Sequence, residues 1–258
     1  MDATALLRCL RESTARTIGS ETKIALAYSG GLDSSFLEKL AMERAEVVCY
    51  TAATEGSTDI RMARDRLVVH PKTTVVSTIE DSDITPYVLK VGLLLDSNDP
   101  TKIAYTIPVY RAIEISEERL VLAGNGADEL FAGYAKYETS KDLEADMRND
   151  FQKMLDESSR LQKAAEERGR RLGLPFASSE MVRLSSTIPI HEKIGPEGRK
   201  LILRAAAREA GVLASDKPKK AAQYSSGVMK AIDRFAKKEH LSAREWTARL
   251  LASERPRP

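Results

Sequence analysis

The sequence predicts an α/β fold, an open parallel sheet covered by helices on both faces and followed by a mainly helical C-terminal part. Short apolar runs alternate with helical patterns between residues 23 and 134, as in proteins that bury a parallel sheet between layers of helices. After Tyr137 the apolar spacing becomes helical throughout. We therefore expect an α/β core over residues 1–137, and a helical part over residues 138–258 that packs on it and completes the same domain.

The predicted strands are short apolar or β-branched runs. They are Lys23 to Ser29 (KIALAYS), Ala45 to Thr51 (AEVVCYT), Thr73 to Thr78 (TTVVST) and Arg119 to Gly126 (RLVLAGNG). Leucines near the N-terminus form one face of a first helix, and Thr58 to Val68 forms another behind a capping signal at Ser57 and Thr58. Such alternation favours a parallel arrangement of the strands.

The C-terminal part is predicted from longer helical patterns. Residues 141–172 contain no proline and one glycine, and their apolar stripe predicts a long amphipathic helix or a pair of helices. Further helical patterns cover Pro196 to Ala210 and Val228 to Lys238. The pattern shows no internal repeat and no low-complexity linker.

Composition indicates a soluble globular protein, with 30% charged and 42% hydrophobic residues among 258. The most apolar run, Tyr87 to Leu95, is far shorter than a spanning helix, and the N-terminus lacks the pattern of a signal peptide. Two cysteines, Cys9 and Cys49, fit a reducing compartment and therefore the cytoplasm. A homo-oligomer is compatible with the sequence.

A turn of the sequence SGGLDSS joins the first predicted strand to the helix that follows it. Gly30 and Gly31 allow the backbone to approach a ligand closely, and successive N–H groups in such a turn, together with the helix N-terminus, bind anions. Ser29, Ser34 and Ser35 add hydroxyl donors. The turn lacks the Gly-Lys-Ser/Thr ending of the Walker loop. It therefore predicts a phosphate site of another kind.

Asp33 lies within this turn, where a carboxylate facing a polyphosphate would be repelled unless a cation lay between them. Its presence implies Mg²⁺, unless it serves only as a helix-capping residue. The turn after the last predicted strand has the same pattern: Gly124, Asn125 and Gly126 precede Asp128 and Glu129 in the first turn of a helix. These acids could act only on the helix dipole. Two such turns instead favour one metal–polyphosphate site between them, at the point where neighbouring strands send their connections to opposite faces.

The pair of motifs SGGLDSS and GNGADELFAGY resembles the synthetase domain of asparagine synthetases and β-lactam synthetase, which has the PP-loop ATP pyrophosphatase fold. The resemblance continues through GLPF, STIPIHEKIGPEGRKLILRAAA and KKAAQYSSGV. It implies an ATP-dependent carbon–nitrogen ligase of amino-acid biosynthesis, which adenylates a small carboxylate, releases pyrophosphate, and transfers the acyl group to ammonia or an amine, releasing AMP.

The resemblance also assigns roles to residues. The SGGLDSS serines and glycines, with Gly124 and Gly126 of the second turn, would bind ATP, and Asp33 and Asp128 would hold Mg²⁺. A catalytic lysine before a Ser/Gly turn corresponds to Lys219 or Lys220, and its asparagine synthetase position, six residues before the glycine, is occupied by Ala221.

Asn125 stands where asparagine synthetases have a glutamate that steers the amino acid, so aspartate is not assured as the substrate. The chain begins MDATALL, without the cysteine of a glutamine-hydrolysing domain. Nitrogen is therefore expected from ammonia, an amine, or a separate glutamine amidotransferase chain.

Two other functions fit parts of the sequence. Residues 193–258 carry 16 Lys and Arg against 7 Asp and Glu, a basic balance that suits nucleic acid and a tRNA-modifying PP-loop enzyme, although such enzymes lack GADELFAGY. An ATP-binding subunit without catalysis would account for Asn125 and the unusual lysine spacing. The ligase is the favoured interpretation because both acids of the metal site are present.

Overall fold

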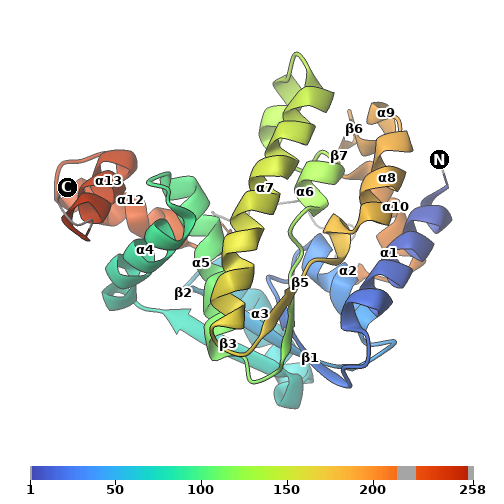
Figure 1. Ribbon diagram of the computed structural model, residues 1–258, viewed down its shortest axis with the longest axis horizontal. Coiled ribbons are helices and arrows are strands. Elements are labelled where there is room, and N and C mark those ends of the chain that lie inside the picture. Colours follow the sequence, from blue (N-terminus) through green and yellow to red (C-terminus); the bar gives the residue numbers. More distant parts are fainter. Residues whose placement is uncertain (1, 214–224, 255–258) are drawn as a thin grey trace. The chain divides into compact units, whose positions relative to one another are not determined.

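The computed structural model describes residues 2–213 and 225–254. It contains a five-stranded parallel sheet in the order β3-β2-β1-β4-β5, flanked by helices (Figure 1). The strands are β1 (Lys23–Ala27), β2 (Glu46–Thr54), β3 (Thr74–Ile79), β4 (Leu120–Leu122) and β5 (Arg171–Gly173). The predicted α/β fold with a helical C-terminal part is thus confirmed.

The helices follow the predicted alternation and continue beyond it. In chain order they are α1 (Ala3–Ile18), α2 (Leu32–Ala41), α3 (Thr58–Val69), α4 (Asp81–Leu95), α5 (Pro100–Ile115), α6 (Ala127–Leu130), α7 (Leu143–Glu166), α8 (Ser179–Thr187), α9 (Ile190–Lys193), α10 (Leu201–Glu209), α12 (Val228–Lys238) and α13 (Ala243–Glu254). Short 3₁₀ turns cover Pro71–Thr73, Ala135–Thr139 and Pro175–Ala177, and a small hairpin pairs β6 (Ile194–Gly195) with β7 (Gly198–Arg199). None of the described helices is long and apolar enough to cross a bilayer.

The chain forms two compact units. The first comprises residues 1–48 and 117–219, and the second comprises residues 49–116 and 220–258. Each unit therefore combines two separate stretches of sequence. The division at residue 137 that the sequence suggested stays a prediction.

In the first unit, α1 packs against α2, α8 and α10, and α7 runs beside β5 and α6 (Figure 1). The apolar stripe of α7 is buried as its spacing predicts, with Met147, Phe151 and Leu161 in the core. A single helix accounts for this stripe. It ends at Glu166, and Arg171–Gly173 then forms β5, which pairs with β4 through Val121 and Leu172.

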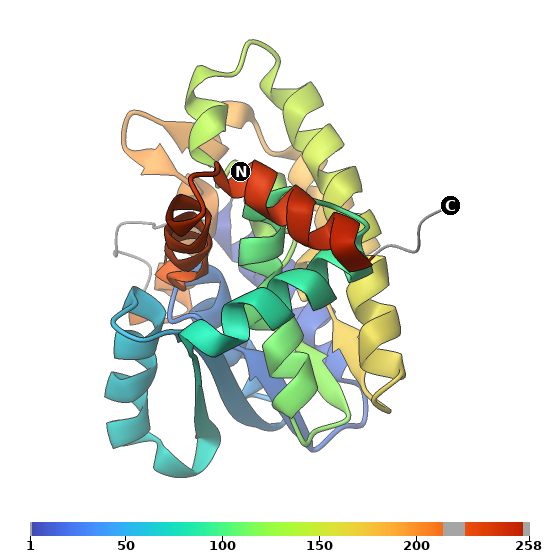
Figure 2. The same ribbon diagram turned by 90° about the vertical axis from the view of Figure 1, so that its left-hand side faces the viewer.

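In the second unit, α12 and α13 pack with α4 and α5 (Figure 2). Trp246, the only tryptophan of the chain, is 1% exposed, and its indole N–H donates to Glu239 at 2.9 Å. Because Trp246 is buried in this unit, it reports on the packing of the unit. A hydrogen bond from Thr54 N–H, at the end of β2, to the carbonyl of Ser226 also lies within this unit.

Asp59 is a buried carboxylate in the first turn of α3. It is 5% exposed, and its Oδ2 accepts a hydrogen bond from the Ser225 hydroxyl at 3.2 Å. Burial raises the pKa of Asp59 to about 7 because desolvation disfavours the charged form. The hydrogen bond from Ser225 opposes this shift only in part.

We expect the raised pKa of Asp59 to make the second unit less stable as pH rises. The unfolded chain releases this proton near pH 4, whereas the folded unit keeps it up to pH 7, so the free energy of unfolding falls between these values, by about 4 kcal/mol in all. Asp59→Asn should flatten this slope. Urea unfolding followed by Trp246 fluorescence at pH 5 and pH 8 measures it, and the exposed Asp65→Asn on the same helix is the matched control. Equal slopes for Asp59→Asn and the unchanged protein would contradict the prediction.

Candidate functional site

The site lies at the topological switch point of the sheet, between β1 and β4. From β1 the chain proceeds to β2 on one side, and from β4 it proceeds to β5 on the other. Ala25 pairs with Val121 and Leu26 with Leu122 in parallel register. The two predicted turns therefore follow the carboxyl ends of two adjacent strands, which is the position where open α/β sheets bind ligands.

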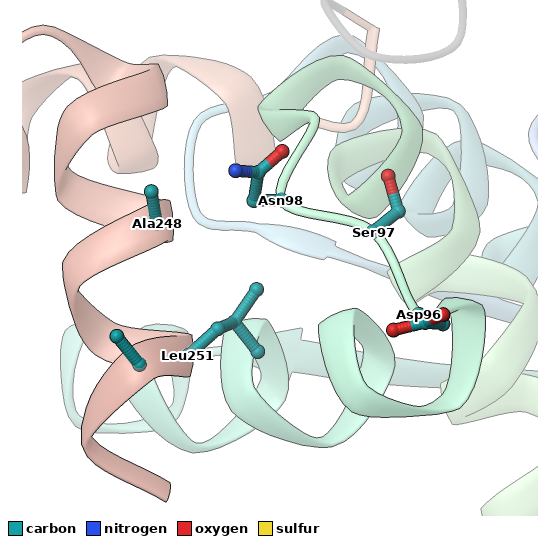
Figure 3. Close-up of a pocket in the computed structure, with 6 residues that line it drawn as sticks. Asp96, Ser97, Asn98, Ala248 and Leu251 are labelled. Carbon is teal, nitrogen blue, oxygen red and sulfur yellow. The ribbon is translucent and has the colours of Figure 1, made fainter. Parts of the chain in front are cut away.

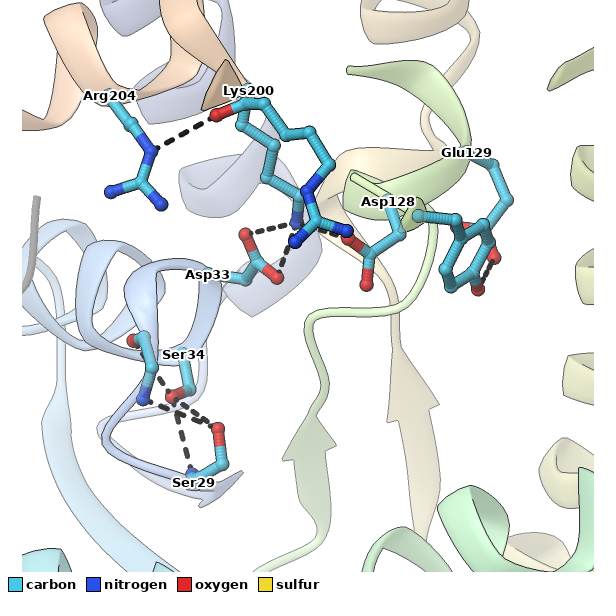
Figure 4. Close-up of polar contacts among 10 residues, drawn as sticks. Ser29, Asp33, Ser34, Asp128, Glu129, Lys200 and Arg204 are labelled. Carbon is cyan, nitrogen blue, oxygen red and sulfur yellow. Dashed lines mark hydrogen bonds and ion pairs between the residues drawn. The ribbon is translucent and has the colours of Figure 1, made fainter. Parts of the chain in front are cut away.

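The first turn is held by hydrogen bonds among its own residues. Ser29 Oγ lies 3.2 Å from Ser34 Oγ, which also accepts from Ser29 N–H at 3.3 Å (Figure 4). Gly30 has a φ of 70°, a conformation that favours glycine, and Gly31 begins α2 with no side chain capping its N–H groups. Ser35 lies 3.4 Å from the Tyr28 hydroxyl. The turn is thus shaped before any ligand binds.

The second turn packs directly against the first. A Cβ at Gly124 would lie 3.2 Å from Asp33 Cβ, so a larger residue there would press on the acid of the first turn. Gly126 has a φ of 96° and begins α6, while Asn125 between them is partly exposed. The two glycines allow the turns to approach each other.

The side chains of Asp33 and Asp128 converge on one ammonium group. Lys200 Nζ lies 2.7 Å from each oxygen of Asp33 and 2.8 Å from Asp128 Oδ1 (Figure 4). The lysine side chain is 1% exposed and the two aspartates are 23% and 22% exposed. Burial lowers the pKa of Lys200, and the charge of Asp33 opposes that shift.

The turn after α6 fits tightly against this ion cluster. A Cβ at Gly133 would lie 1.7 Å from Asp128 Oδ1 and 2.4 Å from Lys200 Cε. Gly133 N–H donates to the carbonyl of Asp128 at 2.8 Å, and Ala132 before it has a φ of 53°. Non-glycine residues rarely adopt that conformation. The chain therefore folds into a constrained turn to bring Asp128 and Lys200 together.

The Glu129 side chain does not join Asp128 in the contact with Lys200. It is 5% exposed and accepts a hydrogen bond from the Tyr134 hydroxyl at 2.5 Å. Burial raises the pKa of Glu129. This acid is therefore anchored inside the unit, which suits a structural role for it.

The residue types of the site fit a magnesium ion. Asp33 and Asp128 supply two carboxylates that already face one cation, and Mg²⁺ is usually held by one or two carboxylates together with phosphate oxygens and waters. Within residues 2–213 and 225–254 there is no cluster of three or more acidic, histidine or cysteine side chains that could hold a metal by themselves. A metal at this site would therefore need ligands from the nucleotide.

The structure brings together most of the predicted site and adds two residues to it. Both turns lie in the first unit, with Asp33 and Asp128 at their meeting point, whereas Lys219 and Lys220 lie outside the described residues. Lys200 and Gly133, which contact the aspartates, were not predicted as site residues. The need for a cation between two facing acids was the one signal that could have indicated a lysine.

A separate hollow in the second unit contains none of the predicted site residues. It is lined by Asp96, Ser97 and Asn98 of the α4–α5 connection and by Ala248, Leu251 and Ala252 of α13 (Figure 3). Its polar groups come from one loop and its other wall is apolar. It offers no pair of charged groups comparable with the site in the first unit.

Comparison with known proteins agrees with the geometry. The family model for asparagine synthase matches residues 5–174, which include both turns and both aspartates. A predicted glutamine-hydrolyzing asparagine synthetase of Methanocaldococcus jannaschii is 32% identical over 90% of this chain and 51% of its own length. A similarly named protein of Acanthamoeba polyphaga mimivirus is 26% identical over 60% of this chain and 29% of its own.

An asparagine synthetase domain-containing protein of Gallus gallus is 31% identical over 50% of this chain and 22% of its own length. The chain thus spans about half of the archaeal relative and less of the others. The family match, however, covers well over half of this chain and includes the turns that build the site. The chain therefore belongs to the asparagine synthase family.

Proposed function

We propose that this protein is an ATP-dependent, AMP- and pyrophosphate-forming ligase that adenylates a small carboxylate and transfers the acyl group to ammonia or an amine. The observation that supports it most is the convergence of Asp33 and Asp128 at the meeting point of two glycine-bearing turns. Family membership supports an enzyme of the ligase type. The choice of carboxylate and of nitrogen donor belongs to the proposal.

In this proposal the first turn binds the part of ATP that leaves as pyrophosphate. The backbone N–H groups at the start of α2 and the hydroxyls of Ser29, Ser34 and Ser35 would donate to its oxygens. Asp33 and Asp128 would hold Mg²⁺, which when bound would neutralise charge that develops on the leaving group. The backbone of the second turn at Gly124 and Gly126 would contact the nucleotide, and Lys219 or Lys220 would contact the α-phosphate and the acyl group.

The substrate acid is proposed to lie near Asn125, which is partly exposed between the glycines of the second turn. An amide there carries no charge, so it would not repel a second carboxylate or attract an ammonium group as a glutamate does. Aspartate is therefore one member of a wider panel of acids. Two of the relatives are named for glutamine hydrolysis. For this chain, ammonia, an amine or a partner amidotransferase is proposed as the nitrogen source.

Exchange of labelled pyrophosphate into ATP tests the first half-reaction without any nitrogen donor. The purified protein is incubated with ATP, Mg²⁺, labelled pyrophosphate and one carboxylate at a time from a broad panel of amino and other small acids. We expect exchange that depends on one class of carboxylate, and AMP with pyrophosphate once ammonium is added. Formation of ADP and phosphate instead would refute the proposal.

A second outcome of the same assay bears on the non-catalytic alternative, which Asn125 and the lysine spacing motivate. A protein that binds ATP tightly in calorimetry, yet gives no exchange with any acid of the panel, would be an ATP-binding subunit. Binding of bulk tRNA that weakens with rising salt would point instead to the tRNA-modifying class.

A further inference from the structure

We propose that Lys200 is a resident counter-ion of the metal site, which occupies the place between Asp33 and Asp128 while no nucleotide is bound and so keeps divalent cations out. The inference rests on the proposed function in taking these two acids as metal ligands. Its basis is one ammonium nitrogen within 2.8 Å of both carboxylates. The inference concerns the nucleotide-free protein.

The charges of the cluster require a cation at this position. Asp33 and Asp128 each place an oxygen within 2.8 Å of Lys200 Nζ, so the two carboxylates lie close to each other, and both side chains are mostly buried. Two carboxylates so close repel each other unless a positive charge lies between them. The Lys200 ammonium supplies that charge at contact distance from both acids.

Lys200 is held in place by its own surroundings. It precedes α10 with a φ of 58°, and its carbonyl accepts from Arg204 N–H at 2.8 Å in the first turn of that helix. Gly133 lies so close to its Cε that the side chain has little room beside that turn. A buried lysine is costly unless it is paired, and its partners here are the two acids. The ammonium thus belongs to the folded unit rather than to solvent.

A divalent cation that binds to both carboxylates must displace this ammonium from them or share them with it. Magnesium holds its oxygen ligands at about 2.1 Å, a shell that leaves no place for a lysine nitrogen between the same oxygens. Without nucleotide the gain from binding the metal is therefore offset by the loss of the Lys200 contacts. Phosphate oxygens supply both further ligands for the metal and a new partner for the ammonium, so binding of metal and nucleotide becomes coupled.

Binding of Mn²⁺ to the nucleotide-free protein, followed by the electron paramagnetic resonance signal of the free ion, tests this inference. We expect Lys200→Met to bind Mn²⁺ at least about tenfold more tightly than the unchanged protein, and Lys200→Arg to show no such gain. Lys193→Met is the matched control. Lys193 is also a buried lysine of the first unit, but it donates to Ser185 and not to either aspartate.

The double variant Asp33→Asn with Lys200→Met should lose the gain, because one of the two carboxylates is removed. An affinity of Lys200→Met equal to or weaker than that of the unchanged protein would overturn the inference. If Lys200→Met does not fold, as judged by its circular dichroism, Asp33→Asn alone decides. Its nucleotide-free Mn²⁺ affinity should equal that of the unchanged protein, and a severalfold loss would show that metal already occupies the acids.

The experiment uses neither ATP nor a carboxylate, so its result is independent of turnover. If Lys200→Met binds Mn²⁺ tightly but the unchanged protein gives no pyrophosphate exchange, the counter-ion role is retained and the adenylation chemistry is refuted. If the unchanged protein gives exchange but Lys200→Met does not alter Mn²⁺ binding, the adenylation chemistry is retained and the counter-ion role is refuted.

Discussion

Asp33→Asn should lower the rate of carboxylate-dependent pyrophosphate exchange by about a hundredfold or more. The asparagine keeps an oxygen that Lys200 can contact, so the first unit should stay folded, but it removes one negative charge from the proposed metal site. Loss of a group that stabilises charge on a leaving oxygen costs about two to three orders of magnitude in rate. The exchange assay with the best carboxylate of the panel measures the effect.

Asp156→Asn is the matched control for this prediction, since Asp156 is exposed on α7 of the same unit. It should leave the exchange rate unchanged. Calorimetric titration with ATP and Mg²⁺ adds a second reading, because Asp33→Asn should bind ATP with a weaker dependence on magnesium. Retention of more than a tenth of the exchange rate by Asp33→Asn would contradict the assignment of this acid.

The position of Asp33 beside Asp128 could be predicted from the sequence because local patterns determine it. An apolar run followed by glycines marks a strand end, and a second such turn ninety-odd residues later marks another. In a parallel sheet the carboxyl ends of all strands lie on one edge, so two acids at such ends can meet. The structure confirms the parallel sheet, and its register places the two turns at adjacent strands.

Lys200 could not be predicted from the sequence because its partners are far along the chain. Its contact with Asp33 spans 167 positions, and the pattern of the surrounding sequence, GRKLILR, predicts the start of an ordinary amphipathic helix. The pattern of charge does not distinguish a buried lysine from a solvated one. Lys200 is buried by tertiary packing, at the start of α10 and against the turn around Gly133.

The strand β5 was missed for a different physical reason. It has three residues, Arg171–Gly173, of which only Leu172 is a large apolar side chain. The helical stripe before it extends the expected helix to Leu172, whereas the helix ends at Glu166. An edge strand this short is stabilised by its pairing with β4, and such pairing leaves no periodic pattern in the sequence.

The second large effect is expected at Gly133, a residue that touches no substrate in the proposal. Gly133 is not among the glycines with a positive φ, so a left-handed backbone is not what disfavours a side chain there. The penalty comes from space, because an added Cβ would overlap Asp128 Oδ1 and crowd Lys200 Cε. The two side chains cannot move apart without losing their ion pair, in which Lys200 Nζ lies 2.8 Å from Asp128 Oδ1. A single methyl group therefore acts on both charges of the site at once.

Gly133→Ala should accordingly reduce pyrophosphate exchange about a hundredfold while lowering the free energy of unfolding by only about 1–3 kcal/mol, the usual cost of an overpacked methyl group. Gly195→Ala is the matched control, because its added Cβ would meet Leu201 Cδ1 at an ordinary 3.4 Å. Exchange kinetics and urea unfolding of both variants measure the two effects separately. If Gly133→Ala kept the exchange rate of Gly195→Ala, the position of the Asp128 carboxylate would not matter for the reaction, and the shared-cation site would lose its main support.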